Sequence, residues 1–253
     1  MPPTPTRTRA AVHGMPEIVP GDDLAARLRD GLAASGLELH DRDVVVVCQK
    51  VVSKAEGRIV DFAGVTPSAF ARSVAAHTGK DPRVVEVVLA ETTRIVKMAD
   101  GHLICETGPG WVCANAGVDE SNAARPGTVT LLPVDPDASA ARLDTALGAA
   151  AGVAIGVVIS DTFGRPWRDG LVEVALGVAG IGALLDFAGT TDRGGRPLQH
   201  TVVAVADELA SAAGLLMAKD VGVPAVLVRG FDAAGTTGRG AALIRPRALD
   251  LFR

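Results

Sequence analysis

Two short runs of aliphatic residues constrain the fold more than any other feature of the sequence. Asp43–Cys48 carries four consecutive valines, and Gly152–Ser160 is apolar almost throughout. A strand with one face in water alternates apolar and polar side chains, whereas an unbroken apolar run of this length is typical of a buried strand. Both segments are therefore predicted to be buried strands.

Helices and shorter strands are predicted around these two runs. Apolar side chains at helical spacing indicate helices at Pro67–Thr78, Asp81–Thr92, Asp137–Ala150 and Ala206–Lys219. Further strands are expected at Ile95–Met98, His102–Glu106, Trp111–Ala114, Thr128–Leu132, Ala183–Phe187 and Ala225–Val228. Asp100-Gly101 predicts a hairpin turn, and the basic segment Thr4–Ala11 is expected to be frayed. Since strands alternate with helices only in the second half, we expect a mixed α/β (α+β) fold.

The bulk properties exclude several classes of protein. With 253 residues, 48% of them hydrophobic, we expect one domain over residues 1–253, with two subdomains as the alternative. The net charge of −4 gives no reason to expect binding to nucleic acid or to anionic membranes. The longest apolar runs are too short to span a bilayer and no apolar signal peptide opens the chain, so a cytoplasmic location is expected. The cysteines, which lack the spacing of a metal site, are Cys48, Cys105 and Cys113.

The segment Ser160–Arg168 follows the second buried strand directly and is the first candidate for chemistry. A carboxylate at the end of a buried strand is a common position for a metal ligand in α/β proteins. Asp161 and the hydroxyl of Thr162 are hard oxygen donors that suit Mg²⁺ or Mn²⁺. Arg165 and Arg168 have the geometry to bind phosphate or carboxylate oxygens. The alternative is a helix cap with two surface arginines, since Asp, Ser and Thr also begin helices.

Other polar segments offer similar groups, but each has a plainer structural explanation. Asp119 and Asn122 bracket a turn rich in oxygen and amide groups, which an ordinary Asx turn also explains. Lys54 follows the first buried strand and is either a phosphate-binding cation or a solvated lysine. Asp207 and Glu208 begin a predicted helix, where acids favour the positive end of the helix dipole. No Walker-type or dinucleotide-type glycine loop is present, so phosphate binding would need other residues.

Taken together, the ordered segments resemble the coenzyme F420-0:L-glutamate ligase family. The matching stretches are Met15–Ile18, Val51–Arg58, Ala116–Asn122, Leu131–Asp137, Ser160–Arg168, Val205–Glu208 and Leu243–Arg253. Each stretch alone is weak, but their order along nearly the whole chain is specific. The resemblance implies a mixed α/β fold with mixed sheets and flanking helices, in an intertwined homodimer.

The resemblance also implies ligands and site residues. The family joins L-glutamate to coenzyme F420-0, with GTP as co-substrate and Mg²⁺ or Mn²⁺ as cofactor; K⁺ is a further candidate cation. By residue matching, the nucleotide would contact Met15, Pro16, Glu17, Ile18, Gln49, Lys54 and Asn122, although the family often has a hydroxyl residue in place of Gln49. The metal would be bound by Asp119, Asp161, Thr162 and Glu208, while Arg165 or Arg168 would hold an anionic group.

The implied reaction needs charge neutralisation more than a nucleophile from the protein. Transfer of the γ-phosphoryl group to the acceptor carboxylate makes an acyl phosphate, which the glutamate amine then attacks. Three rival functions remain open. A metal-dependent phosphohydrolase would use the same acids without glutamate, and a non-catalytic nucleotide-binding protein would not need Asp161 or Glu208. A redox protein that holds the deazaflavin would need stacking surfaces, which the 3% aromatic content offers sparsely.

Overall fold

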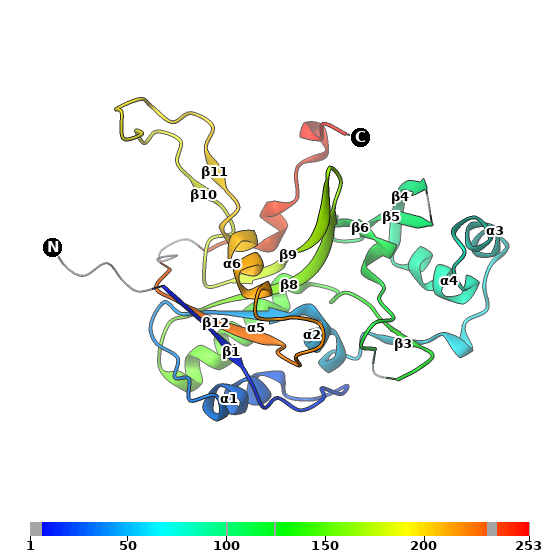
Figure 1. Cartoon of the computed structure of the whole chain (residues 1–253), viewed down its shortest axis with the longest axis horizontal. Coiled ribbons are helices and arrows are strands. Elements are labelled where there is room, and N and C mark those ends of the chain that lie inside the picture. Colours follow the sequence, from blue (N-terminus) through cyan, green and yellow to red (C-terminus); the bar gives the residue numbers. More distant parts are fainter. Residues whose placement is uncertain (1–6, 100, 124, 232–236, 253) are drawn as a thin grey trace.

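The largest sheet is mixed and lies at the centre of the computed structural model, which describes residues 7–99, 101–123, 125–231 and 237–252 (Figure 1). Within the described residues its strand order is β1-β12-β2-β8-β9. The bounds are Thr8–Val12 for β1, Ala225–Arg229 for β12, Val44–Cys48 for β2, Gly156–Arg165 for β8 and Arg168–Ala179 for β9. β2 and β8 are parallel, and the other neighbours are antiparallel. The expected mixed α/β architecture is confirmed.

The valine run of β2 is apolar on both faces because the strand lies between two cores. Val45 and Val47 enter a core that contains residues of helices α1 (Leu24–Ala34), α2 (Gln49–Ala55) and α5 (Pro136–Ala151). Val44 and Val46 enter the opposite core, where helix α6 (Val205–Gly214) packs. All four valines are fully buried, and each contributes roughly 1.5–3 kcal/mol of burial free energy. The two buried strands predicted from sequence therefore form the middle of the sheet.

Strand β8 continues past the predicted end at Ser160 and turns back into the long strand β9. No helix begins at Ser160–Arg168, so the helix-cap alternative is wrong. Asp161 and Thr162 lie within β8, and Arg165 pairs with Arg168 across the tip of the hairpin. The register shifts between Ile159 and Ser160, where a bulge changes the direction of the side chains that follow.

A smaller layer carries its own core on one side of the main sheet (Figure 1). It contains helices α3 (Ala69–Thr78) and α4 (Pro82–Ala90) with the sheet β4 (Thr92–Ala99), β5 (His102–Thr107) and β6 (Val112–Ala114). Strands β3 (Ile59–Asp61) and β7 (Thr128–Thr130) pair in a separate ribbon. The two helices and the hairpin strands expected here are confirmed, while Asp100 of the predicted turn lies outside the described residues.

Some boundaries differ from the sequence-based expectation. Residues 8–11 of the segment expected to be frayed belong to β1, because this edge strand pairs with β12 over its whole length. Helix α6 ends at Gly214 and not at Lys219. The strand expected at Ala183–Phe187 is reduced to β10 (Leu185–Asp186), which pairs with β11 (Val202–Val203) in an arm that extends from the body (Figure 1).

The carboxylate of Asp137 ties the end of the chain to the sheet. Buried at the start of α5, it accepts hydrogen bonds from the backbone amides of Val178, Gly240 and Ala241. These amides belong to β9 and to the short 3₁₀ helix Gly240–Leu243. Further 3₁₀ turns span Phe62–Gly64, Asn115–Gly117 and Arg247–Leu249. In the part of the chain that the structure describes, none of the helices has the length and hydropathy needed to cross a bilayer.

A cleft at the carboxyl ends of two parallel strands

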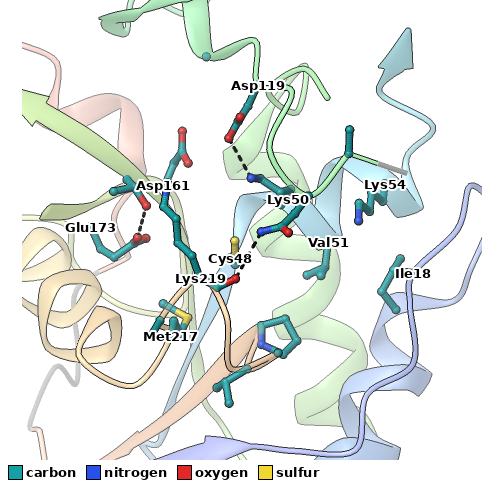
Figure 2. Close-up of a pocket in the computed structure, with 18 of the residues that line it drawn as sticks. Ile18, Cys48, Lys50, Val51, Lys54, Asp119, Asp161, Glu173, Met217 and Lys219 are labelled. Atoms are coloured by element: carbon teal, nitrogen blue, oxygen red, sulfur yellow. Dashed lines mark hydrogen bonds and ion pairs between the residues drawn. The ribbon is translucent and has the colours of Figure 1, made fainter. Parts of the chain in front are cut away.

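A cleft of about 710 Å³ opens where the parallel pairing of β2 and β8 ends (Figure 2). Because these strands are parallel, with Cys48 paired to Ser160, the residues that follow them reach the same edge of the sheet. Lys50 follows β2 and Asp161 follows the paired part of β8, and both line the cleft. The carboxyl edge of parallel strands is the usual position of ligand sites in α/β sheets.

The first polar pair of the cleft is Lys50 and Asp119. The Nζ atom of Lys50 lies 2.8 Å from Asp119 Oδ2 and also donates to the carbonyl and hydroxyl oxygens of Ser121 at 2.8 and 3.0 Å. Burial alone would raise the pKa of Asp119, but the hydrogen bonds from Lys50 and from the backbone amide of Ser121 outweigh it and hold that pKa below its ordinary value. Asp119 is therefore a carboxylate at neutral pH, fixed on the cleft wall.

A strained stretch of backbone delivers Asp119 to the cleft. Asn115, Ala116 and Gly117 all have left-handed φ values, of 53°, 52° and 74°. Gly117 is required for space as well, because a Cβ atom there would lie 2.4 Å from Cγ of Leu132. Asp119 then exchanges two backbone hydrogen bonds with Thr130, at 3.0 and 2.9 Å. A non-glycine residue such as Ala116 in the left-handed region costs free energy, and such residues cluster at functional sites.

The second polar group of the cleft is Asp161 with Thr162 and Glu173. Asp161 projects into the cleft (Figure 2). Glu173 on the opposite strand accepts hydrogen bonds from the hydroxyls of Ser160 and Thr162 at 2.8 and 2.5 Å. Burial raises the pKa of Asp161 to about 7, with the negative charges of Glu173 and Asp119 contributing. A carboxylate in such a position is stabilised in its charged form by a cation.

The segment Met15–Ile18 and Lys54 form another wall of the cleft. Ile18 packs into the core beneath α1, while Glu17 pairs with the ammonium group of Lys54. The side chain of Lys54 is only 7% exposed, whereas that of Glu17 is 70% exposed. A lysine this buried needs a negative partner, so the interpretation of Lys54 as an ordinary solvated lysine is wrong.

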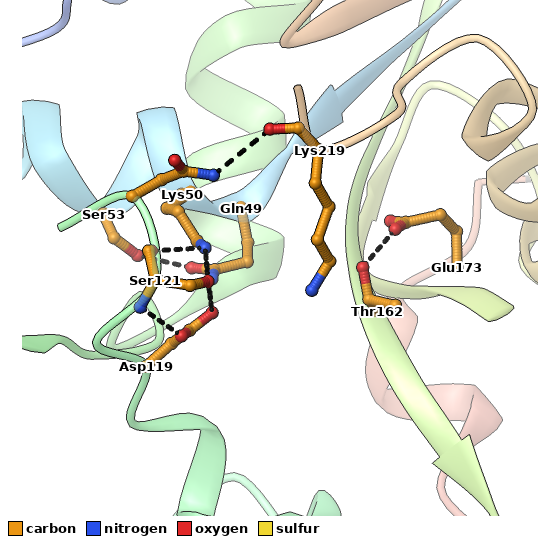
Figure 3. Close-up of polar contacts among 9 residues, drawn as sticks. Gln49, Lys50, Ser53, Asp119, Ser121, Thr162, Glu173 and Lys219 are labelled. Carbon is orange, nitrogen blue, oxygen red and sulfur yellow. Dashed lines mark hydrogen bonds and ion pairs between the residues drawn. The ribbon is translucent and has the colours of Figure 1, made fainter. Parts of the chain in front are cut away.

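Two loops meet across the cleft at Asn122 and Lys219. The side-chain amide of Asn122, a residue with a φ of 50°, donates to the carbonyl oxygen of Lys219 at 3.5 Å. Figure 3 shows the side chain of Lys219 between the Lys50–Asp119 pair and the Thr162–Glu173 pair. The cleft therefore combines carboxylates and amines within one volume, as a site for a metal-bound polyphosphate requires.

The structure brings most of the expected site residues together. Those that line the cleft are Met15, Pro16, Glu17, Ile18, Lys54, Asp119, Asn122, Asp161 and Thr162. Four expected residues are not among its lining: Gln49, Arg165, Arg168 and Glu208.

Each of these four has a different environment. Gln49 is buried within α2, where its side-chain oxygen accepts a hydrogen bond from Ser53 at 2.8 Å. Glu208 is exposed in the first turn of α6, while its neighbour Asp207 binds the backbone amide of Ala175. Arg165 donates to the backbone carbonyls of Asp169 and Gly170 at the hairpin tip, next to the exposed Arg168. Asp119 and Asp161 therefore line the same cleft, whereas Glu208 does not line it.

The donor atoms of the cleft fit a hard divalent cation. Among the described residues, no group of three or more His, Cys, Asp or Glu side chains is arranged to hold a metal alone. Mg²⁺ rarely uses such a cage, because it keeps several waters and is bound by one or two carboxylates together with substrate phosphates. Asp119, Asp161 and the hydroxyl of Thr162 supply that kind of partial shell in one cleft.

Other residues of the cleft have no clear signal in the sequence. Lys50 directly follows the residue after the first buried strand, but only Lys54, four positions later, was expected in the site. Glu173 and Lys219 were missed because β9 and the loop after α6 were not expected. The thiols of the cleft are not nucleophiles, since burial raises the pKa of Cys48 to about 11 and that of Cys113 to about 12.

Comparisons with known proteins give one consistent result. A family model described as F420-0:Gamma-glutamyl ligase matches residues 14–230. The Coenzyme F420:L-glutamate ligase of Methanothermobacter thermautotrophicus is 46% identical over 245 residues, which cover 96% of this chain and 97% of that protein. The protein of the same name from Methanopyrus kandleri is 47% identical over 242 residues, 94% of each chain. That of Archaeoglobus fulgidus is 43% identical over 225 residues, 88% of each.

Proposed function

The chain belongs to the F420-0:gamma-glutamyl ligase family, and from this premise we propose that it joins L-glutamate to coenzyme F420-0 in a reaction driven by GTP. The observation that supports this function best is the cleft itself. Two acidic side chains from distant segments, Asp119 and Asp161, line one volume with Lys50 and Lys54. Such a mixture of acids and amines without an activated thiol suits phosphoryl transfer, in which positioning and charge neutralisation do most of the work.

The proposed chemistry has two balanced steps. An oxygen of the acceptor carboxylate attacks the γ-phosphorus of GTP, the bond to the β-phosphate oxygen breaks, and GDP leaves. The resulting acyl phosphate has phosphate as a good leaving group, which the free carboxylate lacks. The amine of glutamate then attacks the carbonyl carbon, loses a proton and expels phosphate, which carries away one oxygen atom of the original carboxylate.

The residues of the cleft have separate roles in this proposal. Asp119, Asp161 and Thr162 would hold Mg²⁺ or Mn²⁺, which when bound neutralises the phosphate oxygens. Lys50 and Lys54 would add positive charge near the nucleotide tail, and the segment Met15–Ile18 with Asn122 would hold the nucleotide. K⁺ is a further candidate cation. Arg165 and Arg168, at the hairpin tip, are outside the cleft lining and would meet only a part of the acceptor that extends out of the cleft.

A mass-resolved assay tests this function against its main rival. The full chain is incubated with GTP, Mn²⁺, L-glutamate and the glutamate-free coenzyme, and the products are separated by mass. We expect a product heavier by one glutamate residue and release of phosphate that depends on glutamate. A phosphohydrolase would release phosphate equally well without glutamate, and this outcome would overturn the proposal. Asp161→Asn should abolish product formation in the folded protein.

We further propose that the protein works as a homodimer. The arm formed by β10 and β11 extends away from the body of the chain (Figure 1). Its side chains include Leu185 and Val202, which are 43% and 50% exposed. Apolar side chains on a projecting arm favour burial against another surface.

A further inference from the structure

Glu173 is the acidic residue of the cleft that none of the expected roles includes. It lies on β9 directly opposite Thr162 of β8 and lines the cleft. Both of its carboxylate oxygens accept hydrogen bonds: Oε1 from the hydroxyl of Thr162 (Figure 3), and Oε2 from the hydroxyl of Ser160. One carboxylate therefore fixes two hydroxyl groups of the neighbouring strand, and Thr162, which carries one of them, lines the cleft.

The surrounding structure holds Glu173 in this position. The bulge between Ile159 and Ser160 shifts the register so that Glu173 faces Thr162, and Asp207 accepts a hydrogen bond from the amide of Ala175 beside the bulge at 2.9 Å. Ser211 of α6 donates to the backbone carbonyl of Glu173 at 2.8 Å. Gly214 leaves room for its side chain, because a Cβ atom there would lie 2.5 Å from Cγ of Glu173.

The direction of this hydrogen bond determines whether the hydrogen or the lone pairs of the Thr162 hydroxyl remain available to another group. A threonine hydroxyl has one hydrogen and two acceptor lone pairs. The hydrogen of Thr162 is taken by the Glu173 carboxylate, so the lone pairs of the oxygen remain for another group. Thr162 lines the cleft next to Asp161, where a cation is the partner that an oxygen with free lone pairs would prefer.

We infer that Glu173 is a positioning residue for the divalent-cation site: it orients the hydroxyl of Thr162 toward the cation and adds negative charge behind it. This inference rests on the proposed function, because it assumes that Asp161 and Thr162 bind the metal. Outer residues that orient metal ligands by hydrogen bonding are a common feature of metal sites, and their removal typically weakens metal binding by roughly 10–100-fold.

The test is a Mn²⁺ titration of the full chain without nucleotide or acceptor, with free Mn²⁺ followed by electron paramagnetic resonance. Glu173→Ala should weaken Mn²⁺ binding by about tenfold or more, because it removes both the orientation and the charge. Glu173→Gln should weaken it less, since a glutamine oxygen can still accept the hydrogen of Thr162. This graded order would not follow from a purely structural role. Thermal unfolding of each variant identifies a loss that is due to misfolding, and the isosteric Gln variant carries the test if the Ala variant does not fold.

Two controls separate this inference from the proposed function. Glu91→Gln removes one carboxylate of the same kind, paired with Arg58 outside the cleft, and should leave Mn²⁺ affinity unchanged. Asp161→Asn should abolish binding. If Asp161→Asn abolishes binding while both Glu173 variants bind like the wild type, the role of Glu173 is refuted and the metal site stands. If the wild type binds no Mn²⁺ in this titration, and none beyond that held by GTP itself when the titration is repeated with GTP, the metal site is refuted and the role of Glu173 with it.

Discussion

At the scale of single residues, the two acids Asp119 and Asp161 of the cleft have different environments. Asp119 is held in its charged form by Lys50, whereas burial raises the pKa of Asp161 to about 7. Asp119 is therefore negatively charged near neutral pH, whereas the charge of Asp161 depends on pH and on cations. Perturbed carboxylates that face a cleft are typical of functional sites.

The raised pKa of Asp161 predicts a stability gain on neutralisation. Above about pH 7 the folded protein must hold an ionised Asp161, whereas near pH 5 this side chain is already protonated. Asp161→Asn should therefore raise the melting temperature of the metal-free protein near pH 8, and the gain should fade toward pH 5. Thermal denaturation at the two pH values checks this, and a variant less stable than the wild type at pH 8 would contradict it.

Mn²⁺ binding should depend on pH in the same window. A proton competes with the cation for Asp161, so affinity should rise from about pH 5 to about pH 7 and level off above. Asp144→Asn is a matched control, because burial also raises the pKa of Asp144 but that residue lies outside the cleft. The control should retain the pH profile of the wild type. An affinity that is flat across this window would exclude Asp161 as the titrating ligand.

Lys50 is expected to oppose cation binding while supporting the nucleotide. Its ammonium group donates a hydrogen bond to Asp119 Oδ2 at 2.8 Å and so competes with a cation for this oxygen. Lys50→Met should strengthen Mn²⁺ binding in the absence of nucleotide several-fold and raise the KM for GTP, since it removes a positive charge that repels the metal and attracts phosphate. Lys97→Met, an exposed lysine outside the cleft, should change neither value. Weaker Mn²⁺ binding in Lys50→Met would show that Lys50 holds Asp119 in place for the metal.

At the scale of elements, the parts of the fold that burial dictates were predictable and the hairpin that carries the site was not. The valine run and helices α3, α4, α5 and α6 were correctly assigned because their side chains must be buried, whereas α1 and α2 were not predicted. Strand β9 was missed because Pro166 and Trp167, which connect it to β8, do not form one of the usual two-residue hairpin signals. Glu173 could not be assigned for the same reason, since only cross-strand pairing brings it to Thr162.

The contact between β9 and α5 gives a prediction at this scale. A Cβ atom at Gly177 would lie 2.1 Å from the backbone oxygen of Pro136, so an added methyl group forces the strand and helix apart. Gly177→Ala should lower the free energy of unfolding by about 1–3 kcal/mol. Gly164→Ala, in β8 of the same hairpin, would place its Cβ atom 3.9 Å from Cδ2 of Leu171, at ordinary van der Waals distance, and should cost much less. Equal urea denaturation midpoints for the two variants would contradict the close packing of β9 on α5.

At the scale of the whole molecule, the site depends on segments that are far apart in sequence. Met15–Ile18, Lys50, Asp119, Asp161 and Lys219 reach one cleft from separate parts of the chain. Sequence order alone identified several of these segments, but it did not determine which residues meet. Glu208 was grouped with Asp119 and Asp161 by residue matching, yet it lies exposed on α6 and does not line the cleft.

The proposed homodimer is tested at this scale by mass. Light scattering should give about twice the 25.8 kDa of one chain. Leu185→Asp with Val202→Asp places charges on the arm, and we expect this double variant to be monomeric and folded, because a buried apolar contact does not tolerate unpaired charges. A wild-type protein that remains monomeric at micromolar concentration would refute the dimer without affecting the assignment of the cleft.

The transfer of one oxygen atom shows whether GTP activates the acceptor carboxylate. The glutamate-free coenzyme is labelled with ¹⁸O in its carboxylate and converted by the full chain with GTP, Mn²⁺ and L-glutamate. The isotopic composition of the released phosphate is then measured by mass spectrometry. If the acceptor is activated as an acyl phosphate, each phosphate released should carry one oxygen atom from the labelled carboxylate. Phosphate that carries only solvent or GTP oxygen would contradict the account, because GTP would then be hydrolysed without activating the acceptor.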